Sequence, residues 1–244
     1  MWETTKNWAR VIRGLFYPAE CAVCRAAMDA AATSSALCPA CAAELRPLRR
    51  PLCERCSLPF EGAITAEFRC AHCAELRFHF ERAVCGCRLS GVARECIHAF
   101  KYRRALWLGP ELADLMVAAA RERVRWADVD MVVPVPLFGA RQREREFNQA
   151  DWLARRLVRA LGGRVCAGNL IRVRDTAQQA LLNPVERREN VRDAFVARRP
   201  SEFTGRRVAV VDDVFTTGAT TDECARVLRA SGSRSVLVLT VARG

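Results

Sequence analysis

The stretch from Val208 to Thr221 constrains the fold of this 244-residue chain more than any other. It reads Val-Ala-Val-Val-Asp-Asp-Val-Phe-Thr-Thr-Gly-Ala-Thr-Thr, so an apolar run meets two carboxylates and then a threonine-rich turn. Apolar residues without polar alternation predict a strand that is buried on both faces. The pattern after the turn predicts a helix, and the free N–H groups at a helix N-terminus favour anions. The sequence therefore predicts a strand, an acidic edge, an anion-binding loop and a helix, in that order.

The polar residues of this stretch suit a phosphorylated sugar. The carboxylates of Asp212 and Asp213 can accept hydrogen bonds from sugar hydroxyls or hold Mg²⁺. The loop that follows offers hydroxyl and N–H groups to a phosphate, from Thr216, Thr217, Gly218, Ala219 and Thr220. A generic strand–loop–helix turn with an acidic N-cap is the alternative interpretation.

This motif resembles the fingerprint with which type I phosphoribosyltransferases bind 5-phosphoribosyl-1-pyrophosphate (PRPP). The resemblance implies that Asp212 and Asp213 hold the ribose 2′- and 3′-hydroxyls. It also implies that the five-residue loop cradles the 5′-phosphate and that Mg²⁺ accompanies PRPP.

Eight of the thirteen cysteines form four Cys-x2-Cys pairs. They are Cys21 and Cys24, Cys38 and Cys41, Cys53 and Cys56, and Cys70 and Cys73. Thirteen residues separate the first two pairs and also the last two, and the whole pattern recurs with a shift of 32 residues. A four-cysteine module is therefore duplicated. Because thiolates at this spacing fit a tetrahedral ion, each module predicts a structural Zn²⁺ site whose metal supplies folding energy.

Two ligation patterns are compatible with the repeat. In the sequential pattern the first four cysteines bind one zinc and the last four bind the second, and a cross-braced pairing is the alternative. His72 lies within the last pair, where four cysteines leave it without a ligand role. The remaining cysteines, among them Cys85 and Cys87, are expected to be ordinary buried residues.

The rest of the chain alternates strands and helices. Strands are expected at Val84–Leu89, Asp130–Leu137, Asn169–Val173, the fingerprint and Ser235–Val241. Helices are expected at about Ser90–Tyr102, Pro110–Val124 and Asn148–Leu161 and after the fingerprint. This alternation predicts an α/β fold whose parallel sheet is covered by helices on both faces. Ligands of such sheets bind at the carboxyl ends of the strands, where the fingerprint loop lies.

Two further segments leave the predicted strands. Arg141 and Arg145 follow Pro134–Leu137, and beside a phosphoribosyl loop they would meet pyrophosphate. In isolation the same arginines, interleaved with glutamates, would be a solvated helix face. The stretch from Arg172 to Phe195 is long and polar, and such connections often act as lids. No histidine lies near a predicted loop of the site.

Together these segments resemble the ComF (GntX-like) family, over about residues 18 to 244. The resemblance is carried by Pro-Val-Pro-Leu, by Arg-x-Phe-Asn-Gln-Ala, by Thr-x-x-Gln, by Arg-x-Asn-Val-x-x-Ala-Phe, by Gly91–Tyr102 and by the fingerprint. It implies a type I phosphoribosyltransferase-like domain after a small four-cysteine zinc-ribbon domain. It also implies that Arg141 and Arg145 contact pyrophosphate, and that a flexible loop closes over PRPP with Thr176, Gln179, Arg188 and Asn190. Cys85-Gly86-Cys87 departs from the family, which often has an aromatic residue before this glycine.

We expect an amphipathic helix at residues 1–17, a double zinc-ribbon domain at 18–82 and a phosphoribosyltransferase domain at 83–244. No apolar run approaches the ~18 residues of a membrane span, and cysteines without a secretory signal favour metal over disulfides. A cytoplasmic location follows from these features and from the family. Of the net charge of +12, residues 136–199 carry +7, from fourteen arginines and seven acidic residues.

The leading hypothesis is an enzyme that binds PRPP with Mg²⁺ and transfers phosphoribosyl to an unknown acceptor. The family implies a link to DNA uptake in natural transformation or, in some relatives, to carbon-source use. The alternative is a non-catalytic module on the same fold that binds single-stranded DNA or a competence helicase through the basic segment. The zinc domain is a candidate to form a hood over the acceptor, in which case loss of zinc would leave PRPP affinity intact.

Overall fold

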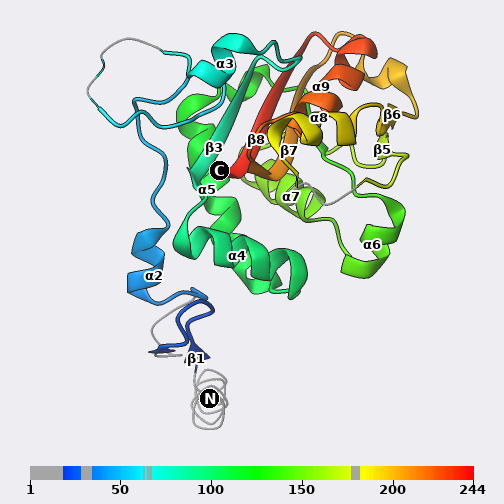
Figure 1. Ribbon diagram of the computed structural model, residues 1–244. Helices are drawn as coiled ribbons and strands as arrows, with labels where there is room; N and C mark the ends of the chain where they lie inside the picture. The colour runs from blue at the N-terminus through cyan, green and yellow to red at the C-terminus, as the bar shows by residue number, and fades with distance from the viewer. Residues whose placement is uncertain (1–18, 29–34, 63, 65–67, 177–181) are drawn as a thin grey trace.

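A computed structural model of the chain describes residues 19–28, 35–62, 64, 68–176 and 182–244. The expected helix at 1–17 and the loop residue Gln179 lie outside these ranges. A cysteine-rich region is followed by an α/β body (Figure 1). Within the described residues, no helix has both the length and the apolar character needed to cross a membrane.

The body is built on a four-stranded, fully parallel sheet of strand order β3-β8-β7-β4. Its strands are β3 (Arg82–Arg88), β4 (Met131–Pro134), β7 (Arg207–Phe215) and β8 (Ser235–Arg243). The central strand β7 pairs with β8 on one side and with β4 on the other. The apolar fingerprint run is therefore buried in the middle of the sheet, as its lack of alternation predicted.

Helices cover both faces of this sheet, as expected (Figure 1). They are α4 (Gly91–Tyr102), α5 (Gly109–Arg123), α7 (Gln149–Leu161), α8 (Pro184–Val191) and α9 (Ala219–Ala230). Ala209 and Val211 of β7 pack in one core with α5 and α7, whereas Val208 and Val210 pack in a second core with α9. Successive side chains of a strand point to opposite faces, so one apolar run supplies both cores.

The helix boundaries follow local signals. Asn148 caps α7, because its side-chain oxygen accepts a hydrogen bond from the Ala150 N–H at 2.9 Å. Ser90 is the N-cap of α4, as its position before the apolar pattern predicted. Short helices occur at α6 (Gly139–Arg145) and in the turns η1 (Leu106–Leu108), η2 (Trp126–Asp128) and η4 (Pro200–Phe203).

One expected strand belongs elsewhere. The strand predicted at Asn169–Val173 is β5 (Leu170–Arg172), which pairs antiparallel with β6 (Phe195–Ala197) in a separate two-stranded sheet. The prediction that it joins the parallel sheet is wrong. The Asn169 side chain bonds both the N–H and the carbonyl of Arg199, which holds the strand beside β6.

The cysteine-rich region precedes the sheet and packs on its β3 edge. It contains β1 (Ala19–Glu20), β2 (Ala27–Met28), α2 (Pro39–Glu44) and α3 (Ala71–Glu75). The Leu48 N–H donates to the Gly86 carbonyl at 2.9 Å, and the Ala83 N–H donates to the Arg55 carbonyl at 2.8 Å. Gly86 has no room for a side chain, because a Cβ there would lie 2.8 Å from the Val241 carbonyl oxygen. The tight packing of β3 therefore explains the glycine between Cys85 and Cys87.

Candidate functional site

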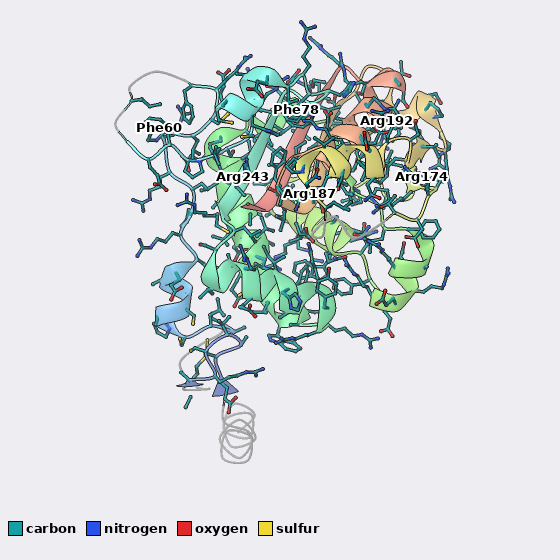
Figure 2. All side chains as sticks on the ribbon, in the orientation of Figure 1. Phe60, Phe78, Arg174, Arg187, Arg192 and Arg243 are labelled. Atoms are coloured by element: carbon teal, nitrogen blue, oxygen red, sulfur yellow. The ribbon has the colours of Figure 1, made fainter. Side chains whose placement is uncertain are left out.

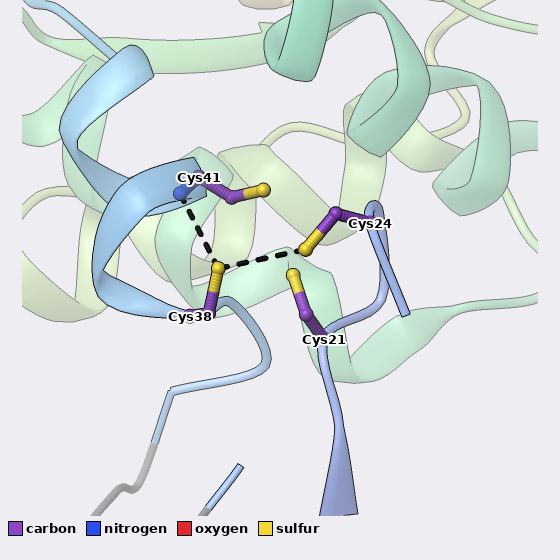
Figure 3. Close-up of side chains that lie close together, drawn as sticks. All are labelled: Cys21, Cys24, Cys38 and Cys41. Carbon is purple, nitrogen blue, oxygen red and sulfur yellow. Dashed lines mark hydrogen bonds between the residues drawn. The ribbon is translucent and has the colours of Figure 1, made fainter. Parts of the chain in front are cut away.

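The eight paired cysteines form two compact groups, each of four sulfur atoms. The groups are Cys21, Cys24, Cys38 and Cys41, and then Cys53, Cys56, Cys70 and Cys73. Within each group the sulfur atoms all lie within 4.8 Å of one another, and Figure 3 shows the first group. Tetrahedral Zn²⁺ with Zn–S bonds of about 2.3 Å requires sulfurs roughly 3.8 Å apart. The described sulfur atoms are therefore grouped in the sequential pattern and not in the cross-braced one.

The chemistry of the second group fits a divalent metal. A hydrogen bond with Cys56 lowers the pKa of Cys53 to about 4, whereas burial raises the pKa of Cys73 to about 12. Four buried thiols without an ion cannot all ionise, since each thiolate repels the next. Zn²⁺ would be held by four thiolates and would remove this conflict. His72 is not a member of the group, as expected.

The fingerprint loop connects β7 to α9. Gly218 has a φ of 81°, and a Cβ there would lie 2.6 Å from the Phe215 ring, so the turn requires glycine. The first N–H groups of a helix have no partners within the helix. All five predicted loop residues line one cavity of about 760 Å³, together with Asp212 and Asp213.

The two carboxylates have different environments. The Asp213 Oδ1 atom lies 2.8 Å from the Lys101 Nζ atom, and the Asp212 Oδ1 atom accepts the Asp213 N–H at 2.9 Å. Burial, and then the charge of Asp213, raises the pKa of Asp212 to about 7 against the opposing charge of Lys101. Burial opposes the charged form of Lys101, yet the two carboxylates raise its pKa above the ordinary value.

The two predicted arginines line the same cavity but make different contacts. The Arg141 Nη2 atom donates to the Thr176 carbonyl at 2.5 Å. The Arg145 guanidinium lies 4.7 Å from the centre of the Tyr102 ring. Arg141 therefore points toward the base of the predicted lid, and Arg145 lies on an aromatic side chain of α4.

Arg172 is a site residue that the sequence did not single out. It lines the cavity, and it bonds the Thr176 hydroxyl through Nη2. Burial, followed by the nearby charge of Arg141, lowers the pKa of Arg172. In the described part of the chain its buried Nε atom has no hydrogen-bond partner. A half-buried guanidinium with an unpartnered Nε donor beside a second cation favours an anion between them.

The segment predicted to close over PRPP is not one continuous loop. Its second half is α8, which begins with a capping box formed by Asn183 and Glu186. Arg188 lies 5.7 Å from the centre of the Phe78 ring, and the Asn190 carbonyl accepts from Arg174 at 3.0 Å. Figure 2 labels the two contact partners, Phe78 and Arg174.

The expectation that no histidine approaches the site is wrong. His98 lines the cavity, with its ring centre 4.9 Å from that of Tyr102. The His72 Nε2 atom lies 3.3 Å from the Thr217 carbonyl oxygen, and the His79 N–H donates to Asp222 at 2.6 Å. These residues come from the cysteine-rich region and from α4, and no local pattern in the sequence signals that they fold back onto the loop.

The parallel sheet, the fingerprint loop and the paired cysteine groups define an α/β protein of the type I phosphoribosyltransferase-like fold with a double zinc ribbon ahead of it. Residues 12–74 match the family model "Double zinc ribbon domain". A solved structure of the allosteric regulatory enzyme of purine biosynthesis is similar over 55% of this chain and 26% of its own, at 24% identity. Its TM-score of 0.36 is too low to bear on function.

Two curated relatives place the chain in a family. Competence protein F of Haemophilus influenzae is 32% identical over 84% of this chain and 96% of its own length. The DNA utilization protein YhgH of Salmonella typhimurium is 32% identical over 94% of this chain and 99% of its own. The chain belongs to this competence protein F/YhgH family, as the sequence motifs predicted.

Proposed function

We propose that this protein binds Mg²⁺·PRPP in the 760 Å³ cavity and transfers its phosphoribosyl group to an acceptor. One observation carries the proposal: the acidic pair, the five-residue loop and two arginines from separate segments line this one cavity. Asp212 and Asp213 would hold the ribose hydroxyls, and the Thr216–Thr220 loop would hold the 5′-phosphate. Arg141 and Arg172 would hold the pyrophosphate.

The reaction would exchange one bond at the ribose C1 for another. The C1–O bond to pyrophosphate breaks, and its electron pair leaves with the pyrophosphate. The acceptor supplies the electron pair of the new C1 bond and loses a proton. Arg141 and Arg172 would stabilise the charge that develops on the leaving group, and Mg²⁺ would add Lewis-acid stabilisation there. Asp212 and Asp213 would hold the sugar while C1 becomes cation-like.

The α4 side of the cavity is available to the acceptor. His98 and Tyr102 form a paired aromatic surface there, and Arg145 covers Tyr102. A flat acceptor would stack on this surface, and His98 could take the proton that the acceptor loses. The acceptor itself stays unknown.

The names of the relatives support a role in the use or uptake of DNA. One is a competence protein and the other a DNA utilization protein. We therefore propose DNA uptake over carbon-source metabolism as the setting of the reaction. A cytoplasmic location belongs to the same proposal, because none of the thirteen cysteines is in a disulfide and paired thiols of this kind persist in a reducing compartment.

Calorimetric titration of Mg²⁺·PRPP into the zinc-loaded protein tests the proposal. Wild type should bind, and the Asp212→Asn/Asp213→Asn variant should lose binding at least a hundredfold. Asp114→Asn is the matched control, since Asp114 is exposed on α5 and lies outside the cavity. A folded wild type that does not bind PRPP would refute the proposal.

A second candidate function, binding of single-stranded DNA or a helicase partner, is favoured by a different surface. A cavity of about 540 Å³ lies between the second cysteine group and β3. Five arginines and two glutamates line it, namely Arg50, Arg55, Arg69, Arg82, Arg123, Glu54 and Glu81. Such a basic surface suits a polyanion. Anisotropy of a labelled oligonucleotide should show affinity that falls steeply with salt and weakens in Arg82→Ser, while PRPP affinity stays unchanged.

A further inference from the structure

The second cysteine group packs directly against the phosphate-binding loop. The helix α3, which begins after Cys70 and contains Cys73, carries His72, whose Nε2 atom lies 3.3 Å from the Thr217 carbonyl oxygen. Phe78, just beyond this helix, packs close to Gly218, since a Cβ there would lie 3.3 Å from the Phe78 ring. Two elements that are far apart in sequence therefore share one interface at the loop.

The same segment also fixes the first turn of α9. The His79 N–H donates to the Asp222 Oδ1 atom at 2.6 Å, and the His79 ring lies 3.3 Å from Oδ2. Asp222 lies in the first turn of α9, which directly follows the loop. The segment after the second group thus contacts the loop and the helix that follows it.

Arg243 connects the second group to the other end of the loop. Its Nη1 atom donates to the carbonyl of Phe215, the last residue of β7, at 3.3 Å. Its Nη2 atom donates to the Cys56 sulfur at 3.7 Å, and its guanidinium lies 5.3 Å from the Phe215 ring centre. Arg243 is buried, and both it and Phe78 are labelled in Figure 2. A metal-bound Cys56 would be a thiolate, which makes this hydrogen bond charge-assisted.

The first cysteine group makes different contacts. It packs in the core that contains α4 and α5, and the Ala36 N–H beside it donates to Glu111 at 2.8 Å. Across the described ranges, no recorded hydrogen bond or ion pair joins its cysteines to residues 212–222. The two groups therefore share one sequence pattern but contact different parts of the fold.

We infer that the second cysteine group, with its metal bound, positions the phosphate loop through Arg243 and His72, whereas the first group does not. This inference rests on the proposed binding of PRPP. Loss of the second metal would separate the four thiols, because the ion is their common centre. Arg243 would then lose its thiolate, and His72 and Phe78 would leave the loop. PRPP would have to order a loosened loop, which lowers its affinity. These contacts argue against the expectation that zinc loss leaves PRPP affinity intact.

Paired cysteine variants test the difference between the groups. Cys56→Ser alters the second group, and Cys24→Ser is the matched control in the first. Each should reduce the zinc content, measured after thiol oxidation with a chromogenic chelator, from two ions to about one. Cys56→Ser should weaken Mg²⁺·PRPP binding at least tenfold, and Cys24→Ser less than twofold. Equal affinities in the two variants would overturn the inference.

Arg243→Met tests the link with both metals in place, in case Cys56→Ser does not fold. It should retain two zinc ions and weaken PRPP binding several-fold, and Arg243→Lys should recover part of the loss. Arg123→Met is the control. Among the described residues the buried Nε atoms of Arg123 and Arg243 both have no hydrogen-bond partner, and Arg123 contacts Ser57 near the second group but not the loop. An Arg243→Met protein that binds PRPP like wild type would count against the positioning role.

Hydrogen exchange separates this inference from the proposed function. The amides of residues 216–221 should exchange faster in Cys56→Ser and Arg243→Met than in wild type, without any ligand. If wild type does not bind PRPP but these amides exchange faster in the two variants, the proposed function is refuted. The inference that the second cysteine group positions the loop is then supported. Unchanged exchange in both variants would refute the coupling, whichever ligand the loop binds.

Discussion

The Lys101 ammonium lies 2.8 Å from a carboxylate oxygen of Asp213, so the acidic pair of the fingerprint forms an ion pair with a lysine of the same chain. Lys101 comes from α4, and Asp213 lies near the end of β7. Two adjacent carboxylates repel each other in a site of low dielectric. The lysine offsets this repulsion for Asp213, and Asp212 keeps a raised pKa. Near neutral pH, Asp212 is therefore protonated in part of the molecules and ionised in the rest.

Replacement of Lys101 should weaken PRPP binding. In Lys101→Gln the cavity loses one positive charge, and the pKa of Asp212 should rise further because a cation that lowers it is gone. We expect about a tenfold loss of affinity at pH 7, roughly 1.4 kcal/mol, measured by calorimetry. Arg121→Gln, on the exposed side of α5, is the control. Tighter binding by Lys101→Gln would instead show that the lysine competes with the ribose for Asp213.

The affinity for Mg²⁺·PRPP should depend on pH through Asp212. Burial raises its pKa to about 7, and ribose hydroxyls and Mg²⁺ both favour the ionised form. Below pH 7 the carboxyl is increasingly protonated, so affinity should fall as the pH is lowered and level off above about pH 8. Binding at pH 7 should release a proton, which titrations in two buffers of different ionisation enthalpy detect. Proton release that persists in Asp212→Asn would assign it to another group.

The local parts of this architecture could be predicted from sequence, because their signals are local. An apolar run followed by Asp212 and a threonine-glycine turn specifies one strand, one loop and one helix. The cysteine spacing likewise predicted two four-thiol groups, but it left open whether the pairs combine sequentially or cross-braced, and the structure shows the sequential grouping. The helix α8 was missed although Asn183, Pro184 and Glu186 form a helix-start signal.

The contacts that complete the site could not be predicted in this way. Lys101, Arg172 and His72 reach the cavity or its loop from three separate segments. Their placement depends on how α4, β5 and the second cysteine group pack on the sheet, and such packing leaves no periodicity in the sequence. Arg145, chosen for its place in an arginine-rich turn, lines the cavity with its guanidinium over the Tyr102 ring, a contact that the sequence did not predict.

Asp212→Asn should stabilise the empty protein at alkaline pH. The folded-state pKa of Asp212 is raised, so its favourable contribution is complete below the unfolded value near 3.8 and is lost as the pH rises through about 7. Asparagine is neutral throughout. The free energy of unfolding of the variant should therefore exceed that of wild type by on the order of 1 kcal/mol at pH 8. At pH 4 the two free energies should be almost equal. Urea unfolding at both values measures this, and an equal gain at both would point to a cause other than ionisation.

Arg172 should matter more for PRPP binding than Arg145. Arg172 is half-buried, and its buried Nε donor has no partner among the described residues. A charge-assisted hydrogen bond to phosphate contributes about 1.5–3 kcal/mol. Arg172→Met should therefore weaken binding about tenfold to a hundredfold, and inorganic pyrophosphate should compete less well with PRPP in this variant. Arg145→Met should change the affinity less than threefold. Arg143→Met, on the exposed side of α6, is the control. Equal losses in the Arg172 and Arg145 variants would contradict this assignment of the pyrophosphate site.

Metal removal should occur in two steps, with different consequences for PRPP. Cys24 is exposed, whereas Cys53, Cys56 and Cys73 of the second group are buried. A chelator therefore reaches the first ion sooner, and zinc release should be biphasic with about one ion in each phase. PRPP affinity should survive the first phase and be lost with the second, because in the described part of the chain only the second group is linked to the loop. Samples taken along the release, assayed for zinc content and for PRPP binding, test this order. Loss of affinity during the first phase would mean that the first group also supports the loop.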